Sequence, residues 1–236
     1  MGTIAILGGT GAQGLGLALR FAVAGEAVVV GSRSAERAAA SALDIAARVP
    51  GAIVRGLDNP GAVAIAERVL LAFPPAGVVE AIDGLSGLLD GKLVIDVMVP
   101  LAFRKGRAEI APVEGAPSLG ELVQRKLPGA RVVSAFKNVS ADLLQDLSRP
   151  LSGDVLVCGD DVAARGEVAA LAARIPDLRP VDAGALSAAH AQEAITALLV
   201  NLNRQHHART SIAIVGLPAD AGVPAGAPGL TRSRGV

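Results

Sequence analysis

The sequence predicts an α/β protein built on a doubly wound parallel sheet. Short apolar runs rich in β-branched residues alternate with longer alanine-rich segments along the 236-residue chain. This alternation is typical of parallel strands joined by crossover helices. Hydrophobic residues make up 51% of the chain and charged residues 19%, which is enough apolar material for a sizeable core.

The first half of the chain predicts alternating strands and helices. The expected strands are β-branched runs bounded by turn residues, at 4–7, 28–30, 53–54, 69–73, 94–96 and 132–135. The expected helices are 12–24, 34–47 with Ser34 as N-cap, a short helix after Asn59-Pro60, and 76–89. Residues 100–117 mix glycine, proline and charge without a period and predict a loop.

A second unit is expected after Pro150. It contains a strand at 154–159, a helix at 162–175, a strand at 178–181, a long helix at 186–203 and a last strand at 211–215. We therefore predict a nucleotide-binding domain over residues 1–150 and a small C-terminal α/β domain over residues 151–217. The remaining tail, 218–236, is rich in proline, glycine and alanine and is predicted to be disordered.

Composition excludes several classes of partner. Basic and acidic residues balance at 22 each, so no global field favours nucleic acid or an anionic membrane. Apolar stretches are interrupted well before the ~18 residues of a membrane span. The mean hydropathy of +0.49 then indicates a buried interface, and we expect a homodimer. A single cysteine, Cys158, and a start without a basic secretory region favour a cytoplasmic protein.

A glycine-rich turn lies between the first expected strand and helix. Gly9, Gly11 and Gly14 have the G-x-G-x-x-G spacing. Glycine allows a tight turn, lets a pyrophosphate approach the backbone and lets helix pack closely on strand, while the helix N-terminus offers free N–H groups to the anion. We predict dinucleotide binding by Gly9, Thr10, Gly11, Ala12, Gln13 and Gly14; the alternative is a turn that only packs tightly.

The end of the second strand predicts which dinucleotide binds. NAD-binding units place an acidic residue here, against the ribose 2′-hydroxyl. This chain has Ser32 and Arg33 instead, with Arg37 one helical turn further on. A hydroxyl and two guanidinium groups suit a 2′-phosphate, so NADP(H) is the expected cofactor. The alternative is that both arginines are ordinary solvated helix charges.

Several longer segments resemble one family, the NADPH-dependent reductases of coenzyme F420. They are "ILGGTGAQGLGLALRFA", "VVVGSRS", "VVSAFKNVSADLLQDL", "DVLVCGDD" and "LRPVDAGALS", in this order between about residues 3 and 218. The resemblance implies a Rossmann-type domain with a small C-terminal domain, a homodimer, and direct hydride exchange between NADPH and the deazaflavin F420. Such a reaction depends mainly on positioning two rings, which fits a sequence without a recognisable catalytic triad or metal motif.

The resemblance also implies a site. Phe73 and Pro74 would border the nicotinamide ribose. The segment containing Lys137, Asn138, Val139 and Ala141 would face the deazaflavin, and Thr196 would hydrogen-bond it. The chain departs from the family pattern at Pro75, Lys137 and Ala194.

Lys137 and the histidines leave alternatives open. The Lys137 ammonium either stabilises negative charge on the reduced deazaflavin or is a solvated loop lysine. His190 either approaches the substrate cleft or lies outside it, whereas His206 and His207 are expected to complement a helix C-terminus. Cys158 is expected to be a buried small hydrophobe.

No metal site is expected, and Asp160-Asp161 is interpreted as a helix cap.

The remaining alternatives concern function. The main prediction is hydride transfer between NADPH and F420. The alternatives are a reductase of another acceptor, such as a flavin, ferric iron or an imine, and a non-catalytic NADP(H)-binding sensor.

Overall fold

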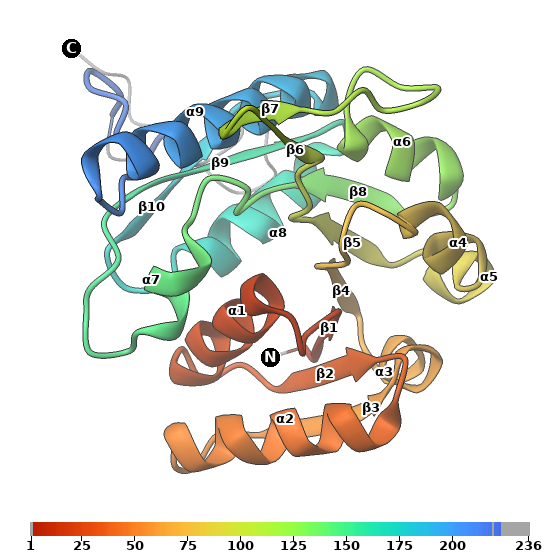
Figure 1. Cartoon of the computed structure of the whole chain (residues 1–236). Coiled ribbons are helices and arrows are strands. Elements are labelled where there is room, and N and C mark those ends of the chain that lie inside the picture. The colour runs from red at the N-terminus through yellow and green to blue at the C-terminus, as the bar shows by residue number, and fades with distance from the viewer. Residues whose placement is uncertain (1, 219, 223–236) are drawn as a thin grey trace.

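The computed structural model describes residues 2–218 and 220–222. Its centre is an eight-stranded sheet in the order β10-β9-β8-β5-β4-β1-β2-β3 (Figure 1). All neighbouring strands are parallel except β8 and β9, which pair antiparallel. The strand order reverses direction at β1, so the predicted doubly wound sheet is confirmed.

The strands of this sheet are short and mostly buried. They are β1 (Ile4–Leu7), β2 (Val28–Ser32), β3 (Val54–Asp58), β4 (Arg68–Leu71), β5 (Leu93–Asp96), β8 (Arg131–Ser134), β9 (Gly153–Gly159) and β10 (Leu178–Asp182). The helices are α1 (Ala12–Val23), α2 (Ala35–Arg48), α3 (Asn59–Ile65), α4 (Val78–Asp83), α5 (Ser86–Leu89), α6 (Leu119–Lys126), α7 (Ala141–Gln145), α8 (Val162–Ala172) and α9 (Ala189–His206). A 3₁₀ turn, η1 (Leu186–Ala188), precedes α9.

Two apolar layers cover the two faces of the sheet. One contains α1, α2 and α8, with Phe21 and Phe136 in edge-to-face contact at 5.7 Å between ring centroids. The other contains α3, α4, α5, α6 and the start of α9. Strand residues therefore face apolar side chains on both sides, which explains why β1 reads as an uninterrupted buried run.

The predicted N-cap of α2 is confirmed. The Arg37 amide donates to the Ser34 hydroxyl at 3.2 Å, as expected of an N-cap. Asp58 caps α3 in the same way through the Gly61 amide. The expected helix over 76–89 is instead two short helices, because α4 ends at Asp83, before Gly84, and α5 begins at Ser86.

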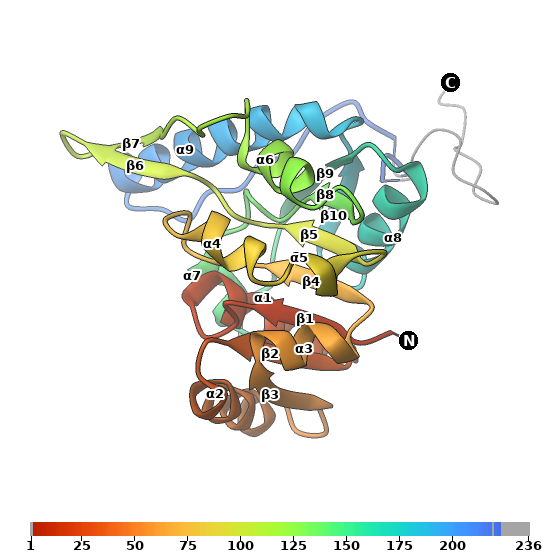
Figure 2. The same cartoon turned by 90° about the vertical axis from the view of Figure 1, so that its right-hand side faces the viewer.

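The expected loop over 100–117 contains a β-hairpin. Strands β6 (Leu101–Arg104) and β7 (Arg107–Ile110) pair antiparallel and project beyond the body of the protein near α9 (Figure 2). Lys105 and Gly106 have φ of 47° and 79°, the left-handed angles of a two-residue type I′ hairpin turn.

The C-terminal unit continues the central sheet. Strands β9 and β10 join it through the β8–β9 pair. The prediction of a strand at 211–215 is wrong: this segment exchanges hydrogen bonds with Asp154 of β9 but has no strand conformation and forms no ladder. The domain boundary at residue 150 stays a prediction. Most of the tail expected at 218–236 lies outside the described residues.

None of the helices in the described part of the chain is both long and apolar enough to cross a bilayer.

Candidate functional site

The carboxyl ends of the parallel strands surround two adjoining cavities. In a sheet whose strand order reverses, the crevice beyond these ends is the usual ligand position. The first, which we call the glycine-turn cavity, has a volume of about 760 Å³. Its lining comprises Gly8, Thr10, Gly11, Ala12, Gln13, Ser32, Arg33, Arg37, Asp58, Asn59, Pro60, Ala72, Phe73, Pro74, Ala76, Gly77, Ala81, Gly84 and Leu85.

Most of the predicted dinucleotide residues line this cavity. Gly9 and Gly14 do not, and their role is to let the turn close. A Cβ on Gly14 would lie 2.6 Å from the Gly8 carbonyl oxygen, and one on Gly9 would lie 2.8 Å from the Ile6 carbonyl oxygen. Gly8, which the prediction omitted, has a φ of 78° and lies against the Ala72 backbone.

Helix α1 begins at this turn without a side-chain cap. Its N-cap is Gly11, and no side chain accepts a hydrogen bond from the first amides. Helices α2, α3, α6 and α8, by contrast, are each capped by a serine or aspartate. The free amides and the partial positive charge of α1 therefore face the cavity, an arrangement suited to a diphosphate.

Arg33 and Arg37 bring positive charge to the other end of the cavity. Both are exposed, and within the described part of the chain neither guanidinium group has an ion-pair partner. The nearby carboxylate of Glu36 accepts from the Ser34 hydroxyl at 2.6 Å, and this hydrogen bond lowers the Glu36 pKa. Two unpaired guanidinium groups beside Ser32 fit a phosphate monoester.

The second cavity, which we call the α9 cavity, has a volume of about 370 Å³. It lies between the end of β5, the turn after β8 and one face of α9. Its lining comprises Gln13, Ala72, Phe73, Val97, Met98, Val99, Leu101, Lys137, Asn138, Val139, Ser140, Ala141, Asp142, Thr196, Leu199, Val200, Asn203 and Thr210. Gln13, Ala72 and Phe73 line both cavities, so the two adjoin at these residues.

Gln13 ties the glycine turn to the turn after β8. Its side-chain amide donates to the Phe136 and Val139 carbonyl oxygens, each at 3.3 Å. Phe136 has a φ of 57°, an unusual angle for a bulky residue, and it is fully buried. A strained residue fixed by packing thus begins the segment that lines the α9 cavity.

All five residues predicted to face the deazaflavin line the α9 cavity, but three polar side chains already have partners. The Asn138 amide donates to the Asp154 carbonyl oxygen at 2.7 Å. The Thr196 hydroxyl lies 3.0 Å from both the Lys137 and the Gln192 carbonyl oxygens, so its lone pairs remain to accept a bond from a ligand.

Of the two alternatives for Lys137, the solvated loop lysine is wrong. Its side chain is fully buried, and its ammonium group lies 2.6 Å from Asp96 Oδ2 and 3.1 Å from Glu193 Oε1. It also donates to the Met98 carbonyl oxygen. Direct contact between this ammonium and a bound ring is not available in this arrangement.

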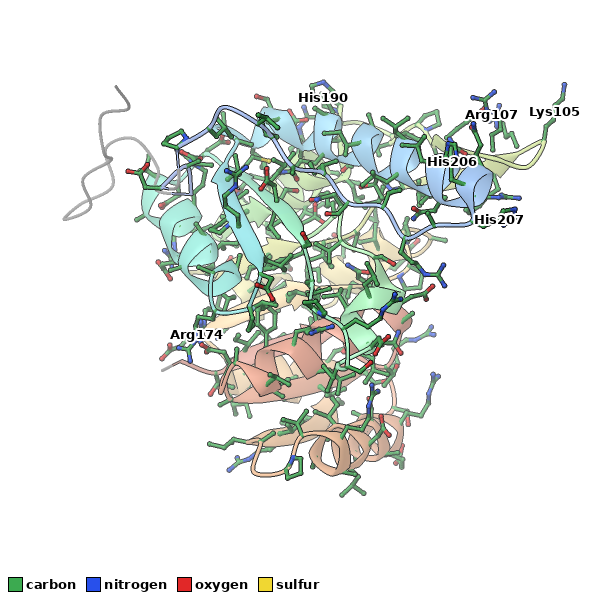
Figure 3. All side chains as sticks on the ribbon, turned by 90° about the vertical axis from the view of Figure 1, so that its left-hand side faces the viewer. Lys105, Arg107, Arg174, His190, His206 and His207 are labelled. Carbon is green, nitrogen blue, oxygen red and sulfur yellow. The ribbon has the colours of Figure 1, made fainter. Side chains whose placement is uncertain are left out.

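The remaining candidates lie away from both cavities. His190 is exposed, bonds the Ser187 carbonyl oxygen and points away from the protein (Figure 3), so it does not approach the cleft. His206 ends α9, and His207 follows it with a left-handed φ of 51°. Asp161 caps α8 as expected. Cys158 is buried, and burial raises the pKa of its thiol to about 12.

Several lining residues were not predicted. Asp58 ends β3, Asn59 and Pro60 follow it, and Ala72 follows β4, so their position at the carboxyl edge was a signal that the sequence offered. Asn59 is nearly buried, and its side-chain oxygen has no hydrogen-bond partner in the described residues. In the described part of the chain, no three His, Cys, Asp or Glu side chains are grouped so that they could hold a metal ion.

Together the uncapped helix, the unpaired arginines and the sheet edge define an NADP-binding Rossmann protein with a second ligand cavity. A family model described as "NADP oxidoreductase coenzyme F420-dependent" matches residues 3–100. An F420-dependent NADP reductase from Methanothermobacter thermautotrophicus is 40% identical over 222 residues, covering 91% of this chain and 95% of that protein. The chain therefore belongs to the F420-dependent NADP reductase family.

Two other matches define the extent of the likeness. A crystal structure of a candidate F420-dependent NADP reductase from Arthrobacter sp. FB24 superposes with a TM-score of 0.76 at 29% identity, covering 91% of this chain and 98% of that one. The metalloreductase STEAP3 of Rattus norvegicus is 30% identical over 187 residues, covering 79% of this chain but 35% of that protein.

Proposed function

We propose that the protein transfers a hydride between NADPH and coenzyme F420. The observation that carries this proposal is the junction of the two cavities at Gln13, Ala72 and Phe73. A dinucleotide whose diphosphate lies at the glycine turn would reach this junction with its nicotinamide. A ring system in the α9 cavity would meet it there, and direct transfer requires that contact.

The chain's residues contribute to the reaction mainly by positioning the two ligands and excluding water. The amides at the start of α1 bind the diphosphate, and Ser32, Arg33 and Arg37 bind the 2′-phosphate. Val97, Leu199 and Val200 give the α9 cavity apolar walls that exclude water from the reacting atoms. The nicotinamide supplies the hydride, and the deazaflavin accepts it.

The share of each relative that this chain covers favours F420 over the alternative acceptors. The chain spans nearly the whole of the archaeal reductase but about a third of the metalloreductase, so the rest of that larger protein has no counterpart here. The sensor alternative is less favoured because a purely NADP-binding protein does not need the adjoining α9 cavity.

Turnover tests the proposal. The purified protein should consume NADPH when oxidised F420 is added, and the visible absorbance of the deazaflavin should fall. It should not consume NADPH when ferric iron, free flavin or a cyclic imine is added instead. NADPH binding without turnover of F420 would support the sensor. Turnover of another acceptor alone would support the alternative reductase.

A variant at the junction adds a structural test. Ala72→Val adds bulk where both cavities meet, whereas the control Ala76→Val adds it in the glycine-turn cavity alone. A displacement of about 1 Å between reacting groups costs on the order of 100-fold in rate, so we expect Ala72→Val to lower kcat at least tenfold more than the control. Equal kcat values for the two variants would contradict a junction at the reacting atoms.

We also propose that the protein is a cytoplasmic homodimer. Support for the dimer comes from exposed apolar side chains on two elements that contact each other, Phe103 on the β6–β7 hairpin and Leu198 on α9. Support for a reducing compartment comes from Cys158, a free buried thiol. Light scattering of the purified protein tests the dimer: a monomeric mass at micromolar concentration would contradict it.

A further inference from the structure

Three segments that are distant in sequence form most of the wall of the α9 cavity. They are the residues after β5, the turn after β8, and the inward face of α9. The Lys137 side chain lies where the three meet and does not point into the cavity. Its ammonium group binds Asp96 at the end of β5, the Met98 carbonyl oxygen one step further on, and Glu193 on α9.

Each of the two carboxylates also accepts hydrogen bonds from groups other than Lys137. Asp96 Oδ1 accepts the Met98 amide at 3.0 Å, and Asp96 Oδ2 accepts the Ser134 hydroxyl at 2.8 Å. Glu193 Oε1 accepts the Leu119 amide at 3.0 Å, at the start of α6. The ammonium thus joins two carboxylates that already accept hydrogen bonds from the backbone after β5 and at the start of α6.

The buried Lys137 ammonium offsets negative charge on Asp96 and Glu193, so a neutral side chain cannot take its place. The Asp96 and Lys137 side chains are 0% exposed and that of Glu193 is 1% exposed. Burial opposes the charge of Lys137, but the Asp96 and Glu193 carboxylates outweigh it and raise the Lys137 pKa above its ordinary value. Burial raises the pKa of the Glu193 carboxyl group above its ordinary value. Without the ammonium, two buried carboxyl groups would face one another.

We propose that Lys137 is a positioning residue for the deazaflavin site: with Asp96 and Glu193 it locks the three walls of the α9 cavity in place without touching the ring. The Thr196 hydroxyl, which donates toward the Lys137 carbonyl oxygen, extends the same link to the face of α9 that lines the cavity. This inference rests on the proposed function, because it assigns the α9 cavity to F420.

The hydrogen-bond geometry predicts unequal effects for the two amide substitutions. Asp96→Asn puts an NH₂ group either against the Lys137 ammonium and the Ser134 hydroxyl or against the Met98 amide, so a donor meets a donor in both orientations. Glu193→Gln keeps a carbonyl oxygen that accepts from both Leu119 and Lys137. We expect Asp96→Asn to be damaging and Glu193→Gln to be mild.

The test compares Lys137→Met, Asp96→Asn and Glu193→Gln in the full chain with a control, Arg165→Met. The control breaks another buried ion pair, Arg165 with Asp182 at 2.8 Å between α8 and β10, and neither residue lines the two cavities. For each variant one measures Tm, the Kd for NADPH by calorimetry, and kcat and KM with F420. Amide hydrogen exchange of the segments 97–99, 137–141 and 193–200 is followed in parallel.

The expected results separate positioning from general stability. Lys137→Met and Asp96→Asn should raise the KM for F420 at least about tenfold and speed exchange in the three segments, with the NADPH Kd changed less than about threefold. Glu193→Gln should raise that KM less than about threefold. An equal KM rise in Arg165→Met at the same loss of Tm would overturn the proposal, as would equal effects of Asp96→Asn and Glu193→Gln.

Two further outcomes remain decisive. If Lys137→Met and Asp96→Asn do not fold, Glu193→Gln still decides the matter, because a tenfold rise in its KM contradicts the hydrogen-bond argument. If the wild-type protein binds NADPH but does not turn over F420, the proposed function fails. The exchange measurement then tests the lock alone: unchanged exchange in all three segments of Lys137→Met would refute it.

Discussion

Replacing Arg33 with alanine should weaken NADPH binding about 10- to 30-fold and leave NADH binding nearly unchanged. Arg33 and Arg37 line the glycine-turn cavity beside Ser32, and neither guanidinium has an ion-pair partner in the described part of the chain. Their role in the free protein is therefore not structural, and the substitution breaks no described contact.

The magnitude follows from the bond that is lost. A hydrogen bond to a charged group contributes about 1.5–3 kcal/mol, and the exposure of Arg33 favours the lower part of this range. A loss of about 1.5–2 kcal/mol corresponds to a 10- to 30-fold rise in the NADPH Kd. NADH lacks the 2′-phosphate, so its Kd should change less than about threefold. Arg33→Asp adds repulsion and should widen the difference between the two nucleotides.

Calorimetric titration of NADPH and NADH into Arg33→Ala, at fixed ionic strength, measures both constants. Arg55→Ala serves as the control, because Arg55 is an exposed arginine of β3 that lines neither cavity. Equal losses for NADPH and NADH in Arg33→Ala, or equal behaviour of the two variants, would refute the assignment of the 2′-phosphate site.

Three other predictions follow from single contacts. Gly14→Ala should weaken NADPH and NADH equally, by about tenfold or more, whereas Gly87→Ala, whose Cβ meets nothing within 4 Å, should bind normally in the same titration. Native Cys158 should resist iodoacetamide at pH 8 and react after unfolding, because its pKa is about 12; fast native labelling, read by mass spectrometry, would contradict its burial. Arg179 lowers the Asp154 pKa, so the Asp154 carboxylate stabilises the fold at neutral pH. This stabilisation is lost as the pH falls below 3.8, the ordinary pKa of the group. Thermal melts should therefore show that Asp154→Asn loses less stability on acidification than the wild-type protein does.

Local patterns were sufficient for part of the glycine-turn cavity. Gly9, Gly11 and Gly14 lie in one strand–turn–helix unit, and Ser32, Arg33 and Arg37 lie within six positions of one another at and after the end of β2. Each group depends on its own short segment, so short-range rules describe it. The β6–β7 hairpin had a similar local signal, a Lys-Gly pair between two four-residue strands, which the absence of a clear alternation obscured.

Long-range pairing explains what the sequence did not reveal. The burial of Lys137 depends on Asp96 and Glu193, which are 41 and 56 residues away. Nothing in the turn "FKNVS" distinguishes a lysine directed to solvent from one enclosed by two carboxylates. The antiparallel pair of β8 and β9, which brings the C-terminal unit into the first sheet, is likewise a contact between segments whose individual patterns are neutral about partner and direction.

Transfer of isotope tests direct hydride exchange at the cavity junction. NADPH carrying deuterium on one face of nicotinamide C4 is mixed with oxidised F420 and the protein, and the reduced deazaflavin is analysed by mass spectrometry and NMR. We predict that the deuterium from one of the two C4 faces appears at C5 of the deazaflavin and that none is lost to water. Reduced F420 without the label from either face, or label released to solvent, would contradict direct transfer.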